Sequence, residues 1–324
     1  MVRVTRFARA ATGFGMAVIG LAAMSCGISS AWAEGRPLQE VRISRIPIAS
    51  YVPMDLAMAR GWFKDEGLDV TVGAVAPGAV SMQGLLSNKL DIIYTSLDAA
   101  MKARAQGFDP VIISNNNNAQ TKTPDAGGLL VRVDSGFKSL KDLEGKQVLV
   151  NVLQNVNWAY TREAIAKAGG DPNKVRFLEV PFQQQVDAML GGRADAASET
   201  EPFTSIGVST GKLSILSYMF VEVQPGLNIA GWVARESWVK EHPVAVAALR
   251  RVLQKAIDFL DSNEEEKTKA ILQFTSLQPD LLKKMTLDTW STKLDVADLQ
   301  KQVVIYQRHG MIDKVFDVKT MIAP

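Results

Sequence analysis

Short apolar runs alternate with longer amphipathic stretches along most of the chain. The apolar runs predict buried strands, and the stretches between them, where apolar residues recur every third or fourth position, predict helices. In the first series the predicted strands are 41–46, 69–74, 91–94 and 111–113, and the predicted helices are 54–66, 80–86 and 98–105. Strands that alternate with helices in this way are typical of βαβ units and a mainly parallel sheet.

A second series of the same kind begins after residue 140. Its predicted strands are 147–150, 175–180, 194–197 and 213–216, and its predicted helices are 158–168, 182–190 and one that Pro202 begins. Two such series predict two α/β lobes. From Pro243 onward the apolar positions have helical spacing, so a helical C-terminal segment is expected.

Composition excludes several classes of function. The 324 residues include 36 Lys and Arg against 34 Asp and Glu, a formal net charge of +2. Scattered charges that nearly cancel provide no basic surface for nucleic acid or for a membrane. One Cys and two His are too few for a zinc-type site, so we expect neither a metal nor a cofactor.

The first 33 residues have the pattern of an export signal. Arginines make the start basic, residues 10–24 are apolar, and Ala31-Trp32-Ala33 is a small-x-small pattern that signal peptidase cleaves. We expect a signal peptide over 1–33, cleavage after Ala33, and a mature protein in the periplasm. An uncleaved anchor and lipid attachment at Cys26 are the alternatives, although the apolar run is shorter than the roughly 20 residues that span a bilayer.

A series of short motifs is spread over nearly the whole chain. Residues 55–70 read DLAMARGWFKDEGLDV, and further motifs follow at 128–136, 139–146, 192–197, Glu201-Pro202-Phe203 and Glu241-His242-Pro243. In this order they resemble the periplasmic binding proteins for nitrate, sulfonates, taurine and thiamine pyrimidine precursors, whose first motif is A-x-x-x-G-Y/F-F-x-x-E-G-L-x-V. The resemblance covers roughly 41–318. Each motif is weak alone, and their order and spacing carry the likeness.

This resemblance implies a type II periplasmic binding protein. Such a protein has two lobes, each a mainly parallel sheet flanked by helices, with two hinge strands between them and a solute held in the cleft. By analogy the first lobe would be 37–134 plus 226–324, and the second 135–225. The implied partners are a small-molecule solute, an ABC permease and its ATPase subunit. We expect a monomer.

Ligands of open α/β sheets bind beyond the carboxyl ends of strands, where loops lead into helix N-termini. Four such junctions lie at 49–51, 95–98, 155–158 and 199–201, and the family analogy adds the loops 115–118 and 225–228. The candidate ligand-binding residues are Ser50, Tyr51, Thr95, Ser96, Asp98, Asn117, Asn155, Asn157, Trp158, Glu199 and Asn228.

Several candidates have a purely structural alternative. Ser96 and Asn157 could cap helices, and Asp98 could complement a helix dipole. Tyr51 and Trp158 could be lids of the core. The asparagine run could be turn chemistry, because Asn tolerates a left-handed backbone.

Departures from the family bear on the ligand. Sulfonate and taurine binders usually carry small hydroxyls where this chain has Leu97-Asp98. The family frequently has Trp before the Glu-Pro motif, where this chain has Thr200, preceded by Glu199. A buried carboxylate repels an anion at a cost of several kcal/mol unless a cation is present. If Asp98 or Glu199 faces the cleft, the solute should offer a donor, as an amine, an amidine, an aminopyrimidine or a zwitterionic sulfonate does.

Two other classes of function are open at this point. Enzymes on the same fold use a Cys nucleophile or a histidine of their own chain, but Cys26 lies in the export signal and His242 and His309 lie at predicted helix ends. Residues 207–211 match G-x-S-x-G, yet the predicted strand follows this pattern, whereas a nucleophile elbow needs it before. We therefore expect no enzyme. A binding protein that presents its ligand to a sensor would have the same sequence features, and gene neighbours would separate the two roles.

Overall fold

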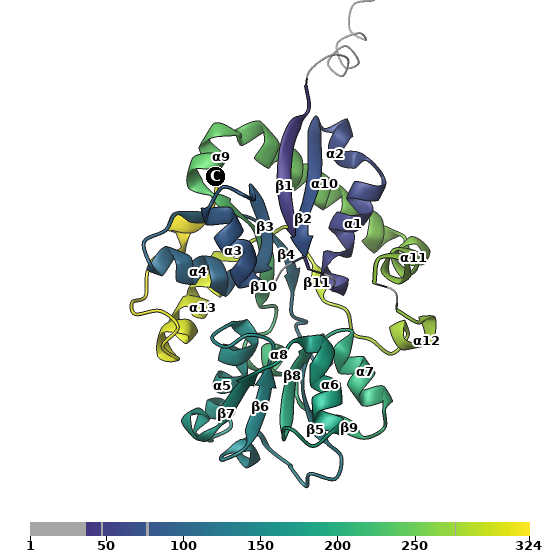
Figure 1. Ribbon diagram of the computed structural model, residues 1–324, viewed down its shortest axis with the longest axis vertical. Coiled ribbons are helices and arrows are strands. Elements are labelled where there is room, and N and C mark those ends of the chain that lie inside the picture. Colours follow the sequence, from purple (N-terminus) through teal and green to yellow (C-terminus); the bar gives the residue numbers. More distant parts are fainter. Residues whose placement is uncertain (1–36, 47, 76–77, 276) are drawn as a thin grey trace, which may run out of the picture. The chain divides into compact units, whose positions relative to one another are not determined.

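A computed structural model describes residues 37–46, 48–75, 78–275 and 277–324, so the expected signal peptide and Cys26 lie outside the described residues. Two β-sheets are present, and each carries helices on both faces (Figure 1). The predicted α/β architecture with two lobes is confirmed. Among the described residues, no helix is both long and apolar enough to cross a bilayer.

The first sheet contains six strands in the order β11-β4-β10-β3-β1-β2. They are β1 (Gln39–Arg45), β2 (Leu68–Val75), β3 (Ile92–Ser96), β4 (Pro110–Asn118), β10 (Asn228–Arg235) and β11 (Thr289–Trp290). Side chains of neighbouring residues point to opposite faces, so Ile92 and Ile93 enter two different apolar clusters. Both faces of this sheet are therefore covered.

The second sheet contains five strands in the order β7-β6-β8-β5-β9. They are β5 (Gly127–Arg132), β6 (Gln147–Val150), β7 (Arg176–Glu179), β8 (Ala196–Thr200) and β9 (Leu213–Ser217). Parallel pairs join β1 to β2 and β3 in the first sheet and β6 to β7 and β8 in the second, as expected, and both sheets are mixed in detail. The strands at which the chain enters each sheet from the other, β5 and β10, run antiparallel to their neighbours.

Strand β5 lies within 37–134, the part of the chain that the family analogy assigned to the first lobe. It pairs with β8 and β9 of the second sheet, so the chain passes between the sheets over 119–126 and returns over 224–227. Glycine permits this packing, because a Cβ at Gly127 would lie 2.4 Å from the ring of Phe220.

The helices of the described residues connect and cover these strands. They are α1 (Val52–Ala59), α2 (Trp62–Asp65), α3 (Gly78–Leu86), α4 (Leu97–Ala105), α5 (Val156–Lys167), α6 (Phe182–Leu190), α7 (Phe203–Ser209), α8 (Met219–Val223), α9 (Glu236–Glu241), α10 (Pro243–Ser262), α11 (Glu264–Thr275), α12 (Pro279–Leu282) and α13 (Val296–Arg308). The single helix predicted over 54–66 is two helices, because Gly61 has φ 72° between them. Pro202 lies just before α7 instead of beginning it.

Three further sequence expectations can be compared with the structure. The asparagine run is part of β4 and not a turn, because its side chains find partners across the sheet. The C-terminal segment is mostly helical up to residue 282 and again in α13, whereas 283–295, which contains the short strand β11, and most of 309–324 are irregular. The pattern at 207–211 lies after most of α7 and before β9, the order predicted from the sequence.

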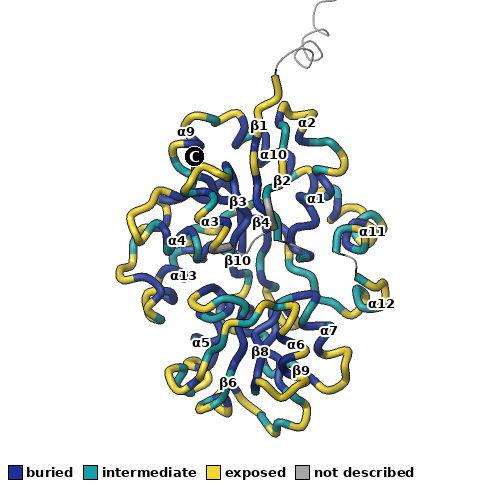
Figure 2. Tube along the Cα trace, viewed as in Figure 1, coloured by how far each residue is buried: buried dark blue, intermediate teal, exposed yellow. Residues whose placement is uncertain are grey.

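One apolar cluster joins the helices of both sheets. Its members include Leu97 of α4, Tyr160 of α5 and Tyr306 of α13, all fully buried, and the rings of the two tyrosines lie 6.4 Å apart. Figure 2 shows the buried residues following the strands and the inner sides of the helices. Helix α13 thus packs against both α4 and α5.

Candidate functional site

Ser50 and Asn117 meet at the carboxyl ends of β1 and β4. The Ser50 hydroxyl, in the short helix Ala49–Tyr51, donates to Oδ2 of Asp288, and Asn117 Nδ2 donates to the same oxygen over 2.8 Å. Asp288 lies in the irregular segment just before β11 and was not among the residues predicted from the sequence. No local pattern could have identified it, because its partners are more than 170 positions away in the chain.

Buried aromatic side chains of the first sheet donate hydrogen bonds to the asparagines beside Ser50. Tyr94 donates its hydroxyl to Asn117 Oδ1 over 2.9 Å, and Trp232 donates its indole N–H to Asn116 Oδ1 over 3.1 Å. Tyr51 is fully buried, donates to the carbonyl of Ser44 over 2.7 Å, and packs its ring against those of Tyr94 and Trp232. These contacts fit the alternative of a core lid, and a ligand contact of Tyr51 stays a prediction.

Asn228 joins the start of β10 to the segment that precedes α13. Its Nδ2 donates to Asn118 Oδ1 over 2.7 Å, its Oδ1 accepts from the backbone of Asp295 over 2.8 Å, and its own backbone N–H donates to Asp298 over 3.0 Å. In this structure, therefore, the polar groups of Asn228 are engaged by the chain itself at a crossing between the sheets.

Asp98 faces the N-terminus of α5. The side chain is 1% exposed, Lys102 Nζ lies 3.6 Å from Oδ2, and no described residue donates to Oδ1. Burial raises the pKa of Asp98, while Lys102, the Ser96 hydroxyl and the backbone N–H of Val156 act to lower it. Lys102 also donates to the carbonyl of Gln154. The Asp98 carboxylate thus approaches a helix end whose free N–H groups favour anions.

Four polar residues at or just before these helix starts differ in their partners. Asn155 caps α5, since its Oδ1 accepts from the backbone N–H of Trp158 over 3.0 Å, and Asn157 donates to Ser198 of β8 over 3.3 Å. Asn157 is therefore not the cap. Ser96 holds the N-cap position of α4 without a side-chain capping bond. Thr95 is fully buried, and its hydroxyl has no partner among the described residues.

Trp158 lies among side chains of α5, β7 and the end of α13. The Arg162 guanidinium is 4.6 Å from the centre of its ring, the Phe177 ring 5.9 Å, and the His309 ring 6.4 Å. His309 in turn contacts Glu163 over 2.9 Å. A ligand that stacked on this ring would have to share it with these groups, and a binding role for Trp158 stays a prediction.

Glu199 is the most isolated carboxylate of the candidates. It is fully buried in β8, and neither of its oxygens has a partner among the described residues. Burial raises the pKa of Glu199 well above its ordinary value, and the charge of Glu201 raises it further. Glu201 is satisfied by comparison, because it accepts from the backbone and hydroxyl of Ser205 and, over 3.3 Å, from the backbone of Thr286.

The carboxylates of Asp288 and Glu201 lie close enough for the charge of one to affect the pKa of the other. Burial raises the pKa of Asp288 to about 7, and the charges of Asp125 and Glu201 contribute, whereas Ser50 and Asn117 act to lower it. The structure thus brings Ser50, Asn117 and the region of Glu199 close to a residue that sequence reasoning missed. Within the described ranges, no group of three or more His, Cys, Asp or Glu side chains is arranged to hold a metal ion.

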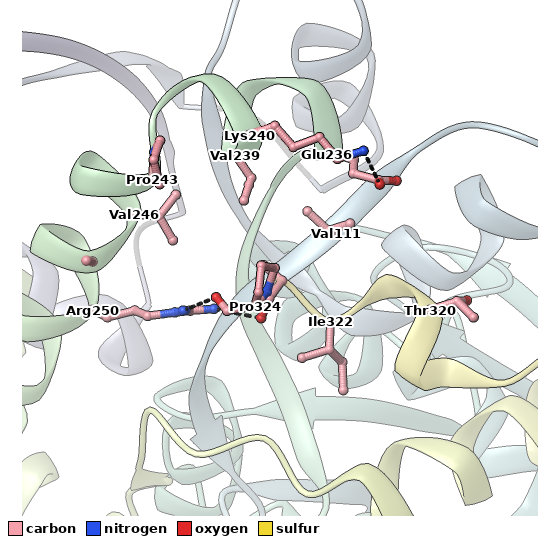
Figure 3. Close-up of a pocket in the computed structure, with 12 residues that line it drawn as sticks. Val111, Glu236, Val239, Lys240, Pro243, Val246, Arg250, Thr320, Ile322 and Pro324 are labelled. Carbon is pink, nitrogen blue, oxygen red and sulfur yellow. Dashed lines mark hydrogen bonds and ion pairs between the residues drawn. The ribbon is translucent and has the colours of Figure 1, made fainter.

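Two cavities differ in chemistry. One, of about 280 Å³, lies between α9, α10 and the end of the chain, where Arg250 donates to the carbonyls of Ala323 and Pro324 (Figure 3). Its lining is largely aliphatic. Neither this cavity nor the next is lined by any of the ligand-binding residues predicted from the sequence. The other, of about 410 Å³, is bordered by Asp125, Glu201, Tyr218 and Thr286. The second cavity has polar groups in its lining, Glu201 among them, and is the better candidate for a solute site.

Comparison with known proteins places these features in a family. A family model described as NMT1/THI5 like matches residues 49–267. A Bacillus subtilis protein named "Putative aliphatic sulfonates-binding protein" is 25% identical over 318 residues, which cover 95% of this chain and 92% of that protein. The formylaminopyrimidine-binding protein of Halalkalibacterium halodurans is 23% identical over 236 residues, 72% of this chain and 69% of that protein. The crystal structure of the periplasmic aliphatic sulphonate binding protein SsuA from Escherichia coli has a TM-score of 0.74 at 16% identity, covering 88% of this chain and 97% of that one.

Proposed function

The chain belongs to the NMT1/THI5-like family, and from this premise we propose that it is the extracytoplasmic solute-binding component of an ABC importer. It holds a small organic solute that contains nitrogen or sulfur and delivers it to a membrane permease with its ATPase subunit. Relatives named as binding proteins for aliphatic sulfonates and for formylaminopyrimidine support this class of solute.

The observation that carries the proposal is that polar groups of the two sheets converge on one short segment. Asp288 is held by Ser50 and Asn117 beside the first sheet, while the backbone of Thr286 donates to Glu201 at the end of a strand of the second. A binding protein needs such convergence, because a solute that closes two lobes must contact both.

The lobes of this proposal follow the sheets. The first extends from residue 37 to the end of β4 and resumes at β10, and the second extends from β5 to α8, with the crossings over 119–126 and 224–227 as hinges. The protein acts as a monomer in the periplasm. Residues 1–33 are its signal peptide, cleaved after Ala33.

Ligand-induced stabilisation tests the function directly. The purified protein is heated with ethanesulfonate, taurine, nitrate, 4-aminopyrimidine or acetamidine, and a bound solute is expected to stabilise the fold by ~2.7 kcal/mol at one hundred times its dissociation constant. Ser50→Ala should weaken that response, whereas Ser262→Ala, at the exposed end of α10, should leave it unchanged. The absence of a saturable response to every probe would contradict a solute-binding role of this class.

A further inference from the structure

A histidine joins the end of α13 to the middle of α5. His309, at the C-cap of α13, has a side chain that is 5% exposed, and its Nε2 lies 2.9 Å from Oε2 of Glu163 on α5. Arg162, also of α5, donates its Nε–H to Nδ1 of the same ring over 3.3 Å. Helix α5 packs on β8 of the second sheet, whereas α13 follows β11 of the first. The contact of His309 with these two residues, the His309 contact, therefore connects elements of both sheets.

Both hydrogen bonds of the His309 ring require the neutral form of the imidazole. A neutral imidazole has one donor and one acceptor nitrogen. Because the Nε–H of Arg162 can only donate, Nδ1 must be the acceptor, which leaves the proton on Nε2 for the bond to Glu163. Protonation of His309 places a second N–H on Nδ1, directly opposite the N–H of Arg162. The hydrogen bond between these two residues is then lost, and two positive charges face each other.

Charged groups approach the His309 ring from both helices. Glu163 and Arg162 face it from α5, and Arg308 precedes it on α13 and forms its own ion pair with Glu163. Asp171 acts on the charge of Arg162 from the loop after α5. Burial lowers the pKa of His309, its hydrogen bond to Glu163 raises it, and the charges of the two arginines lower it further, so the net direction is down. The His309 contact therefore favours the neutral ring.

Arg162 cannot turn away from a protonated ring without losing its other contacts. Its guanidinium donates to the carbonyl of Pro172 over 3.0 Å and to Oδ1 of Asn173 over 2.6 Å, and it lies 4.6 Å from the centre of the Trp158 ring. Because a guanidinium group is planar and turns as one unit, these partners fix the direction of its Nε–H. A proton on Nδ1 of His309 therefore weakens the contact between α5 and α13.

The His309 contact lies at a distance from the crossings between the sheets. Near the start of α13, the backbone carbonyl of Asp298 accepts from Gln224, which belongs to the crossing over 224–227. Arg308 follows ten positions later, about 15 Å further along the helix at 1.5 Å per residue. Rotation about a hinge moves a group in proportion to its distance from the hinge. An opening of the two sheets about the crossings thus moves the His309 contact more than it moves Asp298.

We propose that the His309 contact holds the two sheets together while the ring is neutral and releases them when the ring is protonated. In an open form the ring is exposed to water and has an ordinary pKa of about 6.5, so the open form binds the proton more tightly. The contact is complete above about pH 6.5 and is lost as the pH falls below it. Between pH 8 and pH 5 the ratio of open to closed molecules should rise by up to about thirtyfold. The consequence for transport rests on the proposed function, because a solute between the lobes would leave faster at acidic pH.

Distances between two spin labels test this inference without a solute. Cys26→Ser removes the one cysteine of the chain, and Lys64→Cys on α2 and Gln184→Cys on α6 place labels at exposed positions beside the first and the second sheet. Double electron–electron resonance at pH 8 and pH 5 measures the populations of short and long distances in this parent protein. We expect the long-distance population to grow on acidification.

The two histidines of the chain provide a variant and its matched control. His309→Gln keeps a donor and an acceptor but does not titrate, so its distances should change less between pH 8 and pH 5 than those of the parent protein. His242→Gln replaces the other histidine, whose Nδ1 lies 3.0 Å from the carbonyl of Trp238 on its own helix, and should change as the parent protein does.

Proton NMR of the ring C–H groups of wild type provides a measurement that needs no variant of His309 to fold. The titration should give His309 a pKa below 6.5, and Arg162→Met should raise this pKa because it removes the opposing N–H and its charge. If His309 titrates at or above 6.5 in wild type, or if His309→Gln changes its distances as much as the parent protein, the proposed role of the His309 contact is wrong and the solute-binding role stands. If the distances change as expected but no compound of the thermal panel binds, the proposed function is overturned and the His309 contact stands.

Discussion

Replacing Asp288 by asparagine should stabilise the unliganded protein, and the gain should depend on pH. The carboxylate is buried against Ser50 and Asn117 and lies near the negative charges of Asp125 and Glu201. Asparagine has nearly the same shape, and its carbonyl oxygen can still accept both hydrogen bonds. The substitution therefore removes the charge and leaves most of the packing in place.

The magnitude follows from the pKa. Raising the pKa of Asp288 from 3.8 to about 7 means that the folded state opposes its ionisation by roughly 4 kcal/mol. The folded protein binds this proton more tightly than the unfolded chain does, so its contribution to stability is complete below about pH 4 and is lost as the pH rises to about 7. At pH 8 the variant should thus be more stable than wild type by up to roughly 4 kcal/mol, and at pH 4 the two should agree.

Urea unfolding of both proteins at pH 4, 6 and 8 measures this difference. For a chain of this size the gain at pH 8 corresponds to a rise of roughly 8 °C in the melting temperature. Asp280→Asn should show no difference at any of these pH values, because its carboxylate is exposed. If the variant is less stable than wild type at pH 8, or if its gain in the free energy of unfolding is the same at pH 4 and pH 8, the raised pKa of Asp288 is wrong.

Three other substitutions should affect stability in ways that unfolding experiments can measure. Gly231→Ala should cost roughly 3 kcal/mol, because the new Cβ would lie 2.4 Å from the carbonyl oxygen of Ser114 in the paired strand; an unchanged urea midpoint would contradict this packing. Lys102→Met should cost about 2 kcal/mol at pH 8, because it leaves the buried Asp98 without its cation. Adding Asp98→Asn should restore this loss; a double-mutant cycle without such a rescue would show that the two side chains do not interact. Burial lowers the pKa of His309, so the free energy of unfolding should fall as the pH drops below about 6.5. His309→Gln should reduce this dependence on pH; the same dependence in both proteins would mean that another group causes it.

Local pattern was enough to predict most of the helices and strands. The strand over 147–150 and the helix over 182–190 have the predicted bounds, because burial on one face imposes a period that the sequence displays. The asparagine run shows where this reasoning ends. Asn is rare in strands, but Tyr94 and Trp232 supply donors to its side chains, so tertiary contacts outweigh the local preference.

The candidate site was predictable only in part. The sequence identified the strand ends where Ser50 and Glu199 lie, since the connection of strand to helix is a local feature. It could not identify Asp288, whose contact with Ser50 joins residues 238 positions apart. Nor could it show that Glu199 is fully buried without a hydrogen-bond partner among the described residues, because burial depends on what the rest of the chain places around it.

The segment from Thr286 to Asp288 connects the two sheets through hydrogen bonds at both of its ends. Its two ends are held by groups of different sheets, and a fully extended chain reaches only about 7 Å over two residues. The side chains at its ends and their hydrogen bonds extend that reach by a fixed amount, so a larger separation of Ser50 from Glu201 must break one of these hydrogen bonds. Opening of the two sheets on this side therefore requires the hydrogen bonds of Asp288 or that of Thr286 to break, in addition to any bending of the crossings at 119–126 and 224–227.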